Sequence, residues 1–285
     1  MSIPIIFLHR TDDSYLSFVL RQAKLTNPHS EVVLIGSPPN SKYAVNGIKH
    51  ALIDDYFTGA AEFASVYKHL SPCEYYYNLF CFQRWFVLRD YMRSHHLREC
   101  WAIDSDVMLY ADMKQRDFTY FASENTITSY TAISEIEDLC KLTLEHFSDP
   151  QLYEQLKEYT RLSGHVTSGQ LAVSDMVTQR LYFETMLNRS RCHGFFGSSL
   201  FDTNLTFSFP GVEMLDNKKK IYLIDGGLFF KKRDSGEYLR VNSLHFTTGA
   251  NKKYIPYFYM PNYSPILKGS YYFNYESCHW IPTSL

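Results

Sequence analysis

The stretch Cys100-Trp101-Ala102-Ile103-Asp104-Ser105-Asp106-Val107-Met108-Leu109-Tyr110 decides the fold of this 285-residue chain. Its apolar start predicts a buried strand, which ends abruptly at two carboxylates separated by one small residue. Alternate side chains of a strand share a face, so Asp104 and Asp106, roughly 7 Å apart at their α-carbons, can converge on one ligand. At the carboxyl end of an α/β strand, the natural partner of two acids is a hard divalent cation that also carries phosphate oxygens. The stretch therefore predicts a metal and nucleotide-diphosphate site.

The same three-residue acidic pattern also occurs by chance as a solvated turn. Two apolar runs frame it here, Trp101 to Ile103 before it and Val107 to Tyr110 after it. Because a solvated turn does not require buried strands on both sides, this context favours a binding site.

Composition narrows the classes of function. A net charge of −2 and a pI near 6.6 create no field that would attract nucleic acid, so we expect no nucleic-acid partner. The six cysteines lack CxxC spacing, which predicts a reduced, cytoplasmic protein without a disulfide framework or zinc site. The apolar run from Ile3 to Leu8 is too short for a signal peptide, and no stretch reaches the roughly 20 apolar residues of a membrane span.

The residues before the acidic stretch predict a βαβ unit. Strands are expected from Ile3 to Leu8 and from Val32 to Ile35, with a helix starting near Leu16 between them. Such a unit is right-handed, has parallel strands, and holds nucleotides in the turn after its first strand. A simple helix start explains the polar residues of that turn nearly as well. The candidates for base or ribose contact are His9, Arg10 and Thr11.

The helix predicted most strongly runs from Asn78 to Ser94, with an apolar stripe at helical spacing. Arg84 precedes the strand that carries the aspartates and is a candidate for nucleotide contact. Arg89 and Arg93 are expected on an exposed face. The remaining expected elements are a short strand His50 to Ile53, a helix Ala60 to Leu70, a strand Phe118 to Ala122, helices from Ile133 to Tyr159 interrupted at Asp149-Pro150, and a hairpin about Asp225-Gly226.

A late strand from Val241 ends in His245, after which a loop containing Gly249 presents Lys252 and Lys253. Imidazole can complete a metal site begun by carboxylates, and lysine is a point charge for phosphate. A satisfied structural histidine is an equally good interpretation of His245 taken alone.

Three other stretches carry weaker signals. The segment from Gly164 to Asp175 predicts a turn of small residues, a strand and a helix cap at Ser174 or Asp175. The run Lys218 to Lys220 predicts a solvated loop, with contact to anionic lipid as the alternative. The Tyr-rich tail after Tyr254 is expected to pack as an arm or to offer a partner surface.

Together, the N-terminal βαβ unit, Asp104-Ser105-Asp106 and the late Leu244-His245-Phe246 resemble the GT-A-fold glycosyltransferases, most closely bacterial enzymes that build capsular or lipopolysaccharide glycans. The resemblance implies an α/β fold with a Rossmann-like, mixed, mostly parallel sheet flanked by helices. It implies a catalytic domain over residues 1–253 and an aromatic arm, residues 254–285, packed on it. It also implies Mn²⁺ or Mg²⁺, a nucleotide sugar, with uridine favoured as its base, and a glycan or glycolipid acceptor, met in the cytoplasm or at the inner face of its membrane.

The same resemblance assigns roles to residues. Asp106 and His245 resemble metal ligands, and Asp104 resembles a residue that touches both metal and ribose, with Ser105 between the acids in the nucleotide site. The late motif has one more residue before its glycine than that of relatives, so either Lys252 or Lys253 meets the diphosphate. The other assignments are Ser168, Gly169 and Gln170 on a sugar-binding strand, and Asp202 or Asn204 beside the anomeric carbon. An inverting enzyme would also need a general base for the acceptor hydroxyl, for which Asp175 and Asp202 are candidates.

Two other functions remain open at this point. An aspartate-nucleophile phosphatase shares part of its signature with Asp104-Ser105-Asp106-Val107, although its acidic pair closes the first strand of the chain. A catalytically inactive glycan-binding protein of the same fold would use the aromatic side chains but would not need both aspartates, His245 and the lysines.

Overall fold

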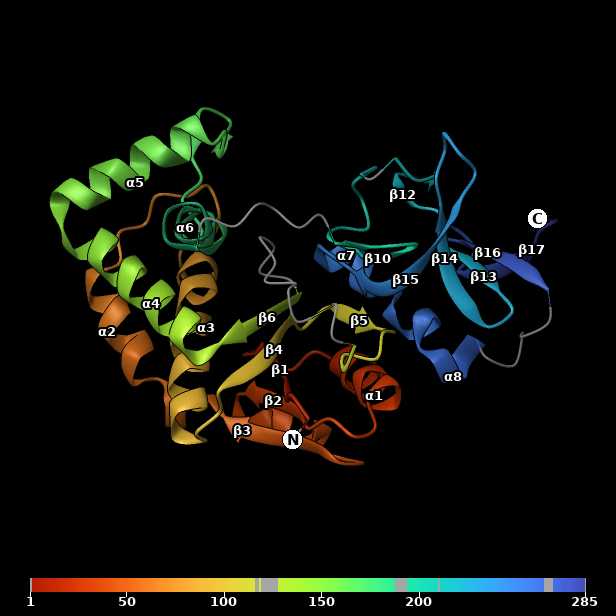
Figure 1. Ribbon diagram of the computed structural model, residues 1–285, viewed down its shortest axis with the longest axis horizontal. Helices are drawn as coiled ribbons and strands as arrows, with labels where there is room; N and C mark the ends of the chain where they lie inside the picture. Colours follow the sequence, from red (N-terminus) through yellow and green to blue (C-terminus); the bar gives the residue numbers. More distant parts are fainter. Residues whose placement is uncertain are drawn as a thin grey trace.

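The computed structural model describes residues 2–115, 118, 128–187, 194–209, 211–263 and 269–284. A five-stranded sheet lies between a layer of helices and a second, larger sheet (Figure 1). This arrangement confirms a mixed α/β fold with a mostly parallel central sheet flanked by helices. Among the described residues, no helix combines the length and the apolar character needed to cross a bilayer.

The central sheet has the strand order β3-β2-β1-β4-β6. Its first four strands are parallel, and β6 runs antiparallel to β4. All five residues of β2 are buried, as expected for a strand covered on both faces. The strands are β1 (Ile5–His9), β2 (Val32–Gly36), β3 (Ile48–Leu52), β4 (Glu99–Asp104) and β6 (Thr128–Ala132).

Side chains alternate across this sheet and feed two separate hydrophobic cores. Phe7 and Trp101 face the core shared with α1 and the second sheet, whereas Ile6 and Ala102 face the core shared with the other long helices. The helices are α1 (Leu16–Thr26), α2 (Thr58–Val66), α3 (Tyr75–Ser94), α4 (Ile133–Ser148), α5 (Pro150–Leu162) and α6 (Asp175–Tyr182), with short helical turns η1 (Pro38–Tyr43), η2 (Ile53–Tyr56) and η4 (Phe183–Leu187).

Helix ends follow local chemistry. Glu74 precedes α3, and its carboxylate accepts a hydrogen bond from the amide of Tyr77 at 2.8 Å. Asp149 separates α4 from α5 and caps the latter, so the predicted interruption at Asp149-Pro150 is confirmed. The helix expected to reach Leu70 ends instead at Val66, and Tyr67 adopts extended backbone.

Apart from β5, the strands of the second sheet come from residues 195–282. The predicted hairpin is confirmed: Asp225 and Gly226 both have positive φ, as a two-residue turn of this type requires. Two strands of the aromatic tail, β16 and β17, extend the sheet beyond β13. The strands are β5 (Val107–Leu109), β9 (Phe195–Phe196), β10 (Ser199–Phe201), β13 (Tyr222–Ile224), β14 (Gly227–Lys231), β15 (Tyr238–His245), β16 (Ser270–Asn274) and β17 (His279–Pro282), accompanied by α7 (Gly249–Lys252), η5 (Ile255–Phe258) and α8 (Met260–Tyr263).

Two sequence-based expectations are wrong, and a third concerns residues that lie mostly outside the described part of the chain. The run Lys218 to Lys220 is not a solvated loop, because its middle residue, Lys219, is buried. Lys219 lies on β12 (Lys218–Lys219), which pairs with β11 (Met214–Leu215). Arg89 is only 14% exposed, because it forms an ion pair with Asp90, whereas Arg93 is exposed as expected. Of the strand expected from Phe118 to Ala122, only Phe118 belongs to the described residues.

Candidate active site

The acidic pair and the late histidine meet because two strands pair. The chain leaves the central sheet at Asp104, turns through Ser105 and Asp106, and enters β5. Strand β5 runs antiparallel to β15 with Val107 opposite His245, and the amide of Phe246 donates to the carbonyl of Asp106 at 3.1 Å. This register fixes His245 beside Asp106, although about 140 residues separate them in the chain.

Asp104, Asp106 and His245 form a compact group of possible metal ligands. One ligand atom from each residue lies within 4.8 Å of the other two. His245 Nε2 is 3.3 Å from Asp106 Oδ1, while Nδ1 of the same ring is 2.7 Å from the carbonyl oxygen of Thr203. Because a carbonyl only accepts hydrogen bonds, Nδ1 carries a proton, and Nε2 is the nitrogen available to a metal.

Lys252, and not Lys253, faces this group. Helix α7 places Lys252 Nζ 3.3 Å from Asp106 Oδ2 and 3.2 Å from the hydroxyl of Tyr15. Lys253 is exposed and lies over the ring of Tyr254, with its ammonium 5.0 Å from the ring centre. Gly249 to Lys252 form a short helix and not the open loop expected from the sequence. The rotation of this helix turns Lys252 toward Asp106 and leaves Lys253 outside the cluster.

Arg84 joins the acidic pair to a third carboxylate. Its Nη1 is 2.5 Å from Asp104 Oδ1, and its Nη2 is 2.8 Å from Asp175 Oδ2 at the start of α6. The indole nitrogen of Trp85 also donates to Asp175 Oδ2, at 3.0 Å. Arg84 can span the two acids because α3 leads directly into β4, so the first half of this helix lies beside the carboxyl edge of the sheet.

The charges of the cluster balance without any added ion. Three carboxylates, from Asp104, Asp106 and Asp175, face the cations of Arg84 and Lys252 and the imidazole of His245. Burial acts to lower the pKa of His245, but the hydrogen bond and charge of Asp106 outweigh it and raise the pKa to about 9. The imidazole therefore carries a proton at neutral pH and completes the balance.

The two aspartates respond differently to burial. Burial raises the pKa of Asp104, and the nearby charge of Asp106 adds to this rise, while Arg84 opposes it. For Asp106, burial is outweighed by His245 and Lys252, so the pKa of this carboxyl falls below its usual value. Asp106 is consequently the more firmly ionised of the two and the stronger anchor for a cation.

The end of β1 contributes a second polar group beside the acidic turn. His9 Nδ1 lies 2.8 Å from Ser105 Oγ, and His9 Nε2 lies 2.8 Å from Asp13 Oδ2 and 2.9 Å from Thr11 Oγ1. Arg10 turns away from the acids, stacks 4.0 Å over the ring of Phe80, and donates to a backbone carbonyl of α3. His9 and Ser105 are thus brought to the cluster, whereas Arg10 and Thr11 lie on its margin.

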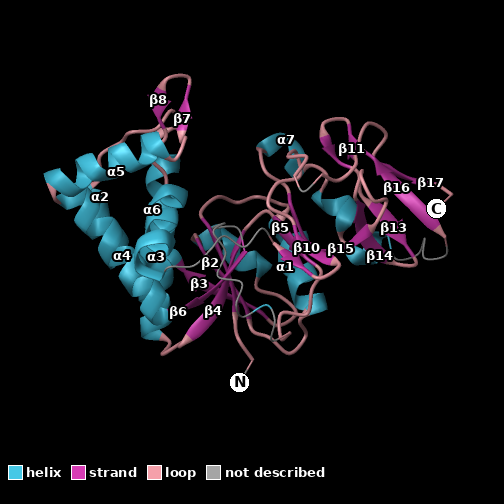
Figure 2. Cartoon of the chain, turned by 45° about the horizontal axis from the view of Figure 1, so that its top comes forward, coloured by secondary structure: helices cyan, strands magenta, loops and turns pink. Residues whose placement is uncertain are grey.

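Ser168, Gly169 and Gln170 are not brought to the cluster. Ser168 and Gly169 both have positive φ and form the tight turn between β7 (Val166–Thr167) and β8 (Gln170–Leu171). All three residues are exposed, and the hairpin projects above α5 and α6, away from β4 and β5 (Figure 2). The expected sugar-binding strand is therefore a surface hairpin, because consecutive left-handed residues reverse the chain here.

Asp202 and Asn204 lie behind His245. The side chain of Asp202 is fully buried, 2.5 Å from Lys219 Nζ, and accepts a hydrogen bond from the amide of His245 at 3.1 Å. The side-chain oxygen of Asn204 accepts hydrogen bonds from Thr206 and Thr247 at 2.8 Å. Both side chains are committed to neighbouring protein groups, which argues against contact with a sugar carbon.

Several contacts of the cluster were not foreseen from the sequence. Tyr15 holds Lys252, Asp13 holds His9, Trp85 holds Asp175, and Lys219 holds Asp202. Trp85 and Asp13 lie within two residues of a predicted site residue in the sequence, which is a usable signal. Tyr15 and Lys219 carry none, because only the tertiary fold brings them to their partners.

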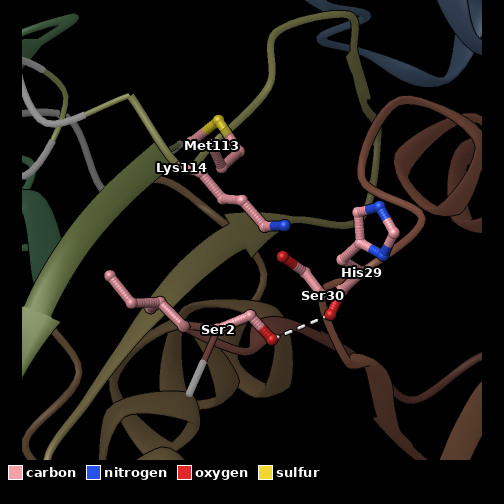
Figure 3. Close-up of a pocket in the computed structure, with 6 residues that line it drawn as sticks. Ser2, His29, Ser30, Met113 and Lys114 are labelled. Atoms are coloured by element: carbon pink, nitrogen blue, oxygen red, sulfur yellow. Dashed lines mark hydrogen bonds between the residues drawn. The ribbon is translucent and has the colours of Figure 1, made fainter.

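Among the described residues, a wide hollow lies away from the cluster and a very small one reaches it. A hollow of about 740 Å³ is lined by Ser2, Ile3, His29, Ser30, Met113 and Lys114 (Figure 3). It lies at the amino end of β1, the opposite edge of the sheet from the acidic turn. A hollow that reaches Asp104 and Arg84 measures only about 20 Å³, room for one water molecule. Since Lys252 already contacts Asp106, a divalent ion that binds this carboxylate must displace the ammonium.

Comparison with known proteins gives a distant structural likeness. No family model matches the chain, and no curated protein matches it either. Among solved structures, the apo form of mouse xyloside xylosyltransferase 1 aligns over 65% of this chain and 82% of its own, with a TM-score of 0.45 and 7% identity. A TM-score and an identity this low do not assign a function to this chain.

Proposed function

We propose that the protein is a metal-dependent glycosyltransferase, which moves a sugar from a nucleoside-diphosphate sugar, with UDP as its nucleotide, to a hydroxyl group of a glycan or glycolipid in the cytoplasm. One observation carries this proposal: Asp104 and Asp106, at the carboxyl edge of a mostly parallel sheet, meet His245 through the pairing of β5 with β15. Ligand sites of α/β sheets lie at this edge.

The donor atoms suit Mn²⁺ or Mg²⁺. Two carboxylates and one neutral imidazole nitrogen are ligands that manganese accepts, and the oxygens alone suit magnesium. Asp104, Asp106 and His245 would hold the ion, with Nδ1 of the histidine already committed to Thr203. When bound, the ion supplies positive charge for the oxygens of the departing diphosphate.

The residues around the ion site then have separable tasks. Lys252, whose ammonium lies beside Asp106, would supply positive charge to the same phosphate oxygens as the bond to the anomeric carbon breaks. Arg84 holds the carboxylates of Asp104 and Asp175 in place through two charge-assisted hydrogen bonds. Asp175 is 4% exposed and accepts hydrogen bonds from Arg84 and Trp85, so, like Asp202, it acts on the protein side and orients Arg84.

The nucleoside would lie against the end of β1. His9 is buried against Ser105 and Asp13, and burial lowers the pKa of its imidazole, so a neutral ring faces the ligand. Its two ring nitrogens contact Ser105, Asp13 and Thr11, so His9 would meet a ribose hydroxyl or a base edge by exchanging one of these partners for the ligand. Gly249, at the start of α7, remains a candidate donor contact from the resemblance, whereas the exposed hairpin of Ser168, Gly169 and Gln170 lies away from the cluster and is not assigned to the donor.

The test is hydrolysis of UDP-sugars by the full chain, with manganese and without it. We expect manganese to support slow release of UDP, and Asp106→Asn to reduce it by at least about a hundredfold, because one direct ligand of the ion loses its charge. Asp55→Asn is the matched control, since Asp55 is exposed in η2, away from the cluster.

Two outcomes would overturn the proposal. If Asp106→Asn leaves manganese-dependent turnover unchanged, the cluster is not the site of chemistry. If no UDP-sugar raises the melting temperature of the wild-type protein, with or without manganese, while free glycans do, the protein binds glycans and transfers nothing.

A further inference from the structure

A buried ion pair lies directly behind the candidate metal ligand and has no part in the mechanism above. Lys219 and Asp202 have side chains only 1% and 0% exposed, and Nζ lies 2.5 Å from Oδ1. Lysine is almost never fully buried unless it is paired, and pairs of this kind contribute little net stability compared with apolar residues of the same size. A role in geometry is therefore the more informative explanation of this pair.

The carboxylate of Asp202 controls His245 from two directions. Its Oδ2 accepts a hydrogen bond from the backbone amide of His245 at 3.1 Å. The next residue, Thr203, presents the carbonyl that accepts from His245 Nδ1 at 2.7 Å. Asp202 thus fixes both the backbone of His245 and the chain segment that orients its ring.

The lysine is itself held firmly. The amide of Lys219 donates to the carbonyl of Leu205 at 2.8 Å, and the amide of Leu205 donates to the carbonyl of His245 at 3.2 Å. The carbonyl of Lys219 accepts from the buried hydroxyl of Tyr275 at 2.7 Å. These bonds connect the aromatic tail, through Lys219 and Asp202, to the backbone of His245.

We propose that Asp202, held by Lys219, is a positioning residue that aims Nε2 of His245 at Asp106. The side chain of Asp202 is fully buried behind His245 and acts only through this residue. The consequence for catalysis rests on the proposed function, because it takes His245 to be a metal ligand. Loss of such an outer partner of a ligand histidine typically lowers metal affinity by about 10- to 100-fold.

Two double variants separate hydrogen bonding from mere packing. Asp202→Leu with Lys219→Met removes both charges, keeps a similar volume and leaves no acceptor for the amide of His245. Asp202→Asn with Lys219→Gln also removes both charges but keeps an amide oxygen as that acceptor. Changing both partners together avoids leaving a single buried charge, which would itself unfold the protein.

Two measurements on the full chain decide the proposal. The first is NMR of the metal-free protein, in which His245→Gln assigns the Nδ1–H signal of His245. We expect this signal to stay protected from exchange in the amide pair and to be lost in the apolar pair. The second is manganese affinity by calorimetry, which we expect to fall 10- to 100-fold in the apolar pair and to stay within about threefold in the amide pair.

Equal behaviour of the two double variants in the NMR measurement would overturn the positioning role. If the wild type binds no manganese, the proposed function fails, but the ring signal still tests whether Asp202 positions His245. If the ring signal changes as expected while manganese affinity does not, His245 is positioned by Asp202 but is not a ligand, and the catalytic consequence is refuted.

Discussion

Replacing Lys252 by methionine should change two binding affinities in opposite directions. In the metal-free protein, the ammonium of Lys252 lies 3.3 Å from Asp106 Oδ2 and balances its charge. A divalent ion that binds Asp106 must displace this ammonium or bind against its repulsion. A diphosphate that accompanies the ion gains the same ammonium as a partner.

The magnitudes follow from the distance and the exposure of the side chains. Two unit charges 3.3 Å apart attract each other by about 1 kcal/mol in water and by about 5 kcal/mol at an effective dielectric constant of 20. Because Lys252 is 30% exposed, we take the lower part of this range. A gain of about 1 to 2 kcal/mol makes manganese alone bind about 5- to 30-fold tighter in Lys252→Met. Loss of the lysine–phosphate hydrogen bond, about 1.5 to 3 kcal/mol, makes UDP bind about 10- to 150-fold more weakly in the presence of manganese.

Calorimetric titration measures both affinities: manganese into the free protein, then UDP into the manganese-loaded protein. Lys253→Met is the matched control, because Lys253 carries the same charge one position further on but is exposed over Tyr254. We expect the control to stay near wild type in both titrations. The reasoning is refuted if Lys252→Met weakens manganese binding, or if UDP binding to the loaded protein does not change.

Three further predictions concern pH and stability. The pKa of His245 rises on folding from an ordinary 6.5 to about 9, so the stability that its protonated ring contributes should be complete below pH 6.5 and lost as the pH rises through 9. Urea unfolding of the wild type and of His245→Gln at pH 6 and pH 9 measures this contribution. The same difference in unfolding free energy between the two proteins at both pH values would contradict the prediction. Manganese affinity should increase between pH 6.5 and 9, whereas the stability contributed by the protonated ring decreases, because the ion binds the neutral imidazole of His245. An affinity that calorimetry shows to be independent of pH would exclude His245 as a ligand. Thr248, next to α7, has φ of 68° and ψ of 147°, a backbone conformation that glycine adopts more easily than threonine. Thr248→Gly should therefore raise the free energy of unfolding by about 0.5 to 2 kcal/mol. A loss of stability would show that no strain is stored at this position.

The elements that the sequence predicted well are those built by local patterns. Continuous apolar runs predicted β1, β2 and β4, and the polar residues at their ends predicted which edge of the sheet would hold the site. The convergence of Asp104, Asp106 and His245 was also predicted and is confirmed. That success came from the family resemblance of the late His245 segment, since no local pattern reveals that β5 pairs with β15.

The features that could not be predicted depend on long-range packing. The run Lys218 to Lys220 reads as a solvated loop, and only the fold shows that its middle lysine pairs with Asp202 in the core. The choice between Lys252 and Lys253 depends on the phase of a four-residue helix, which is too short for any periodic signal.

The hairpin at Ser168-Gly169 illustrates a different limit. A Ser-Gly pair fits a strand beside a ligand, where small side chains allow close approach, and it fits a tight turn equally well. The backbone conformation decides between the two, and here both residues have positive φ.

The most direct test of the central claim is a crystal of the full chain grown with manganese and UDP, with anomalous scattering used to locate the metal. The account predicts one strong manganese peak within about 2.5 Å of carboxylate oxygens of Asp104 or Asp106 and of Nε2 of His245, with diphosphate oxygens completing the coordination and Lys252 turned toward them. A UDP-bound crystal in which His245 still contacts Asp106 directly, with no metal peak between them, would contradict it.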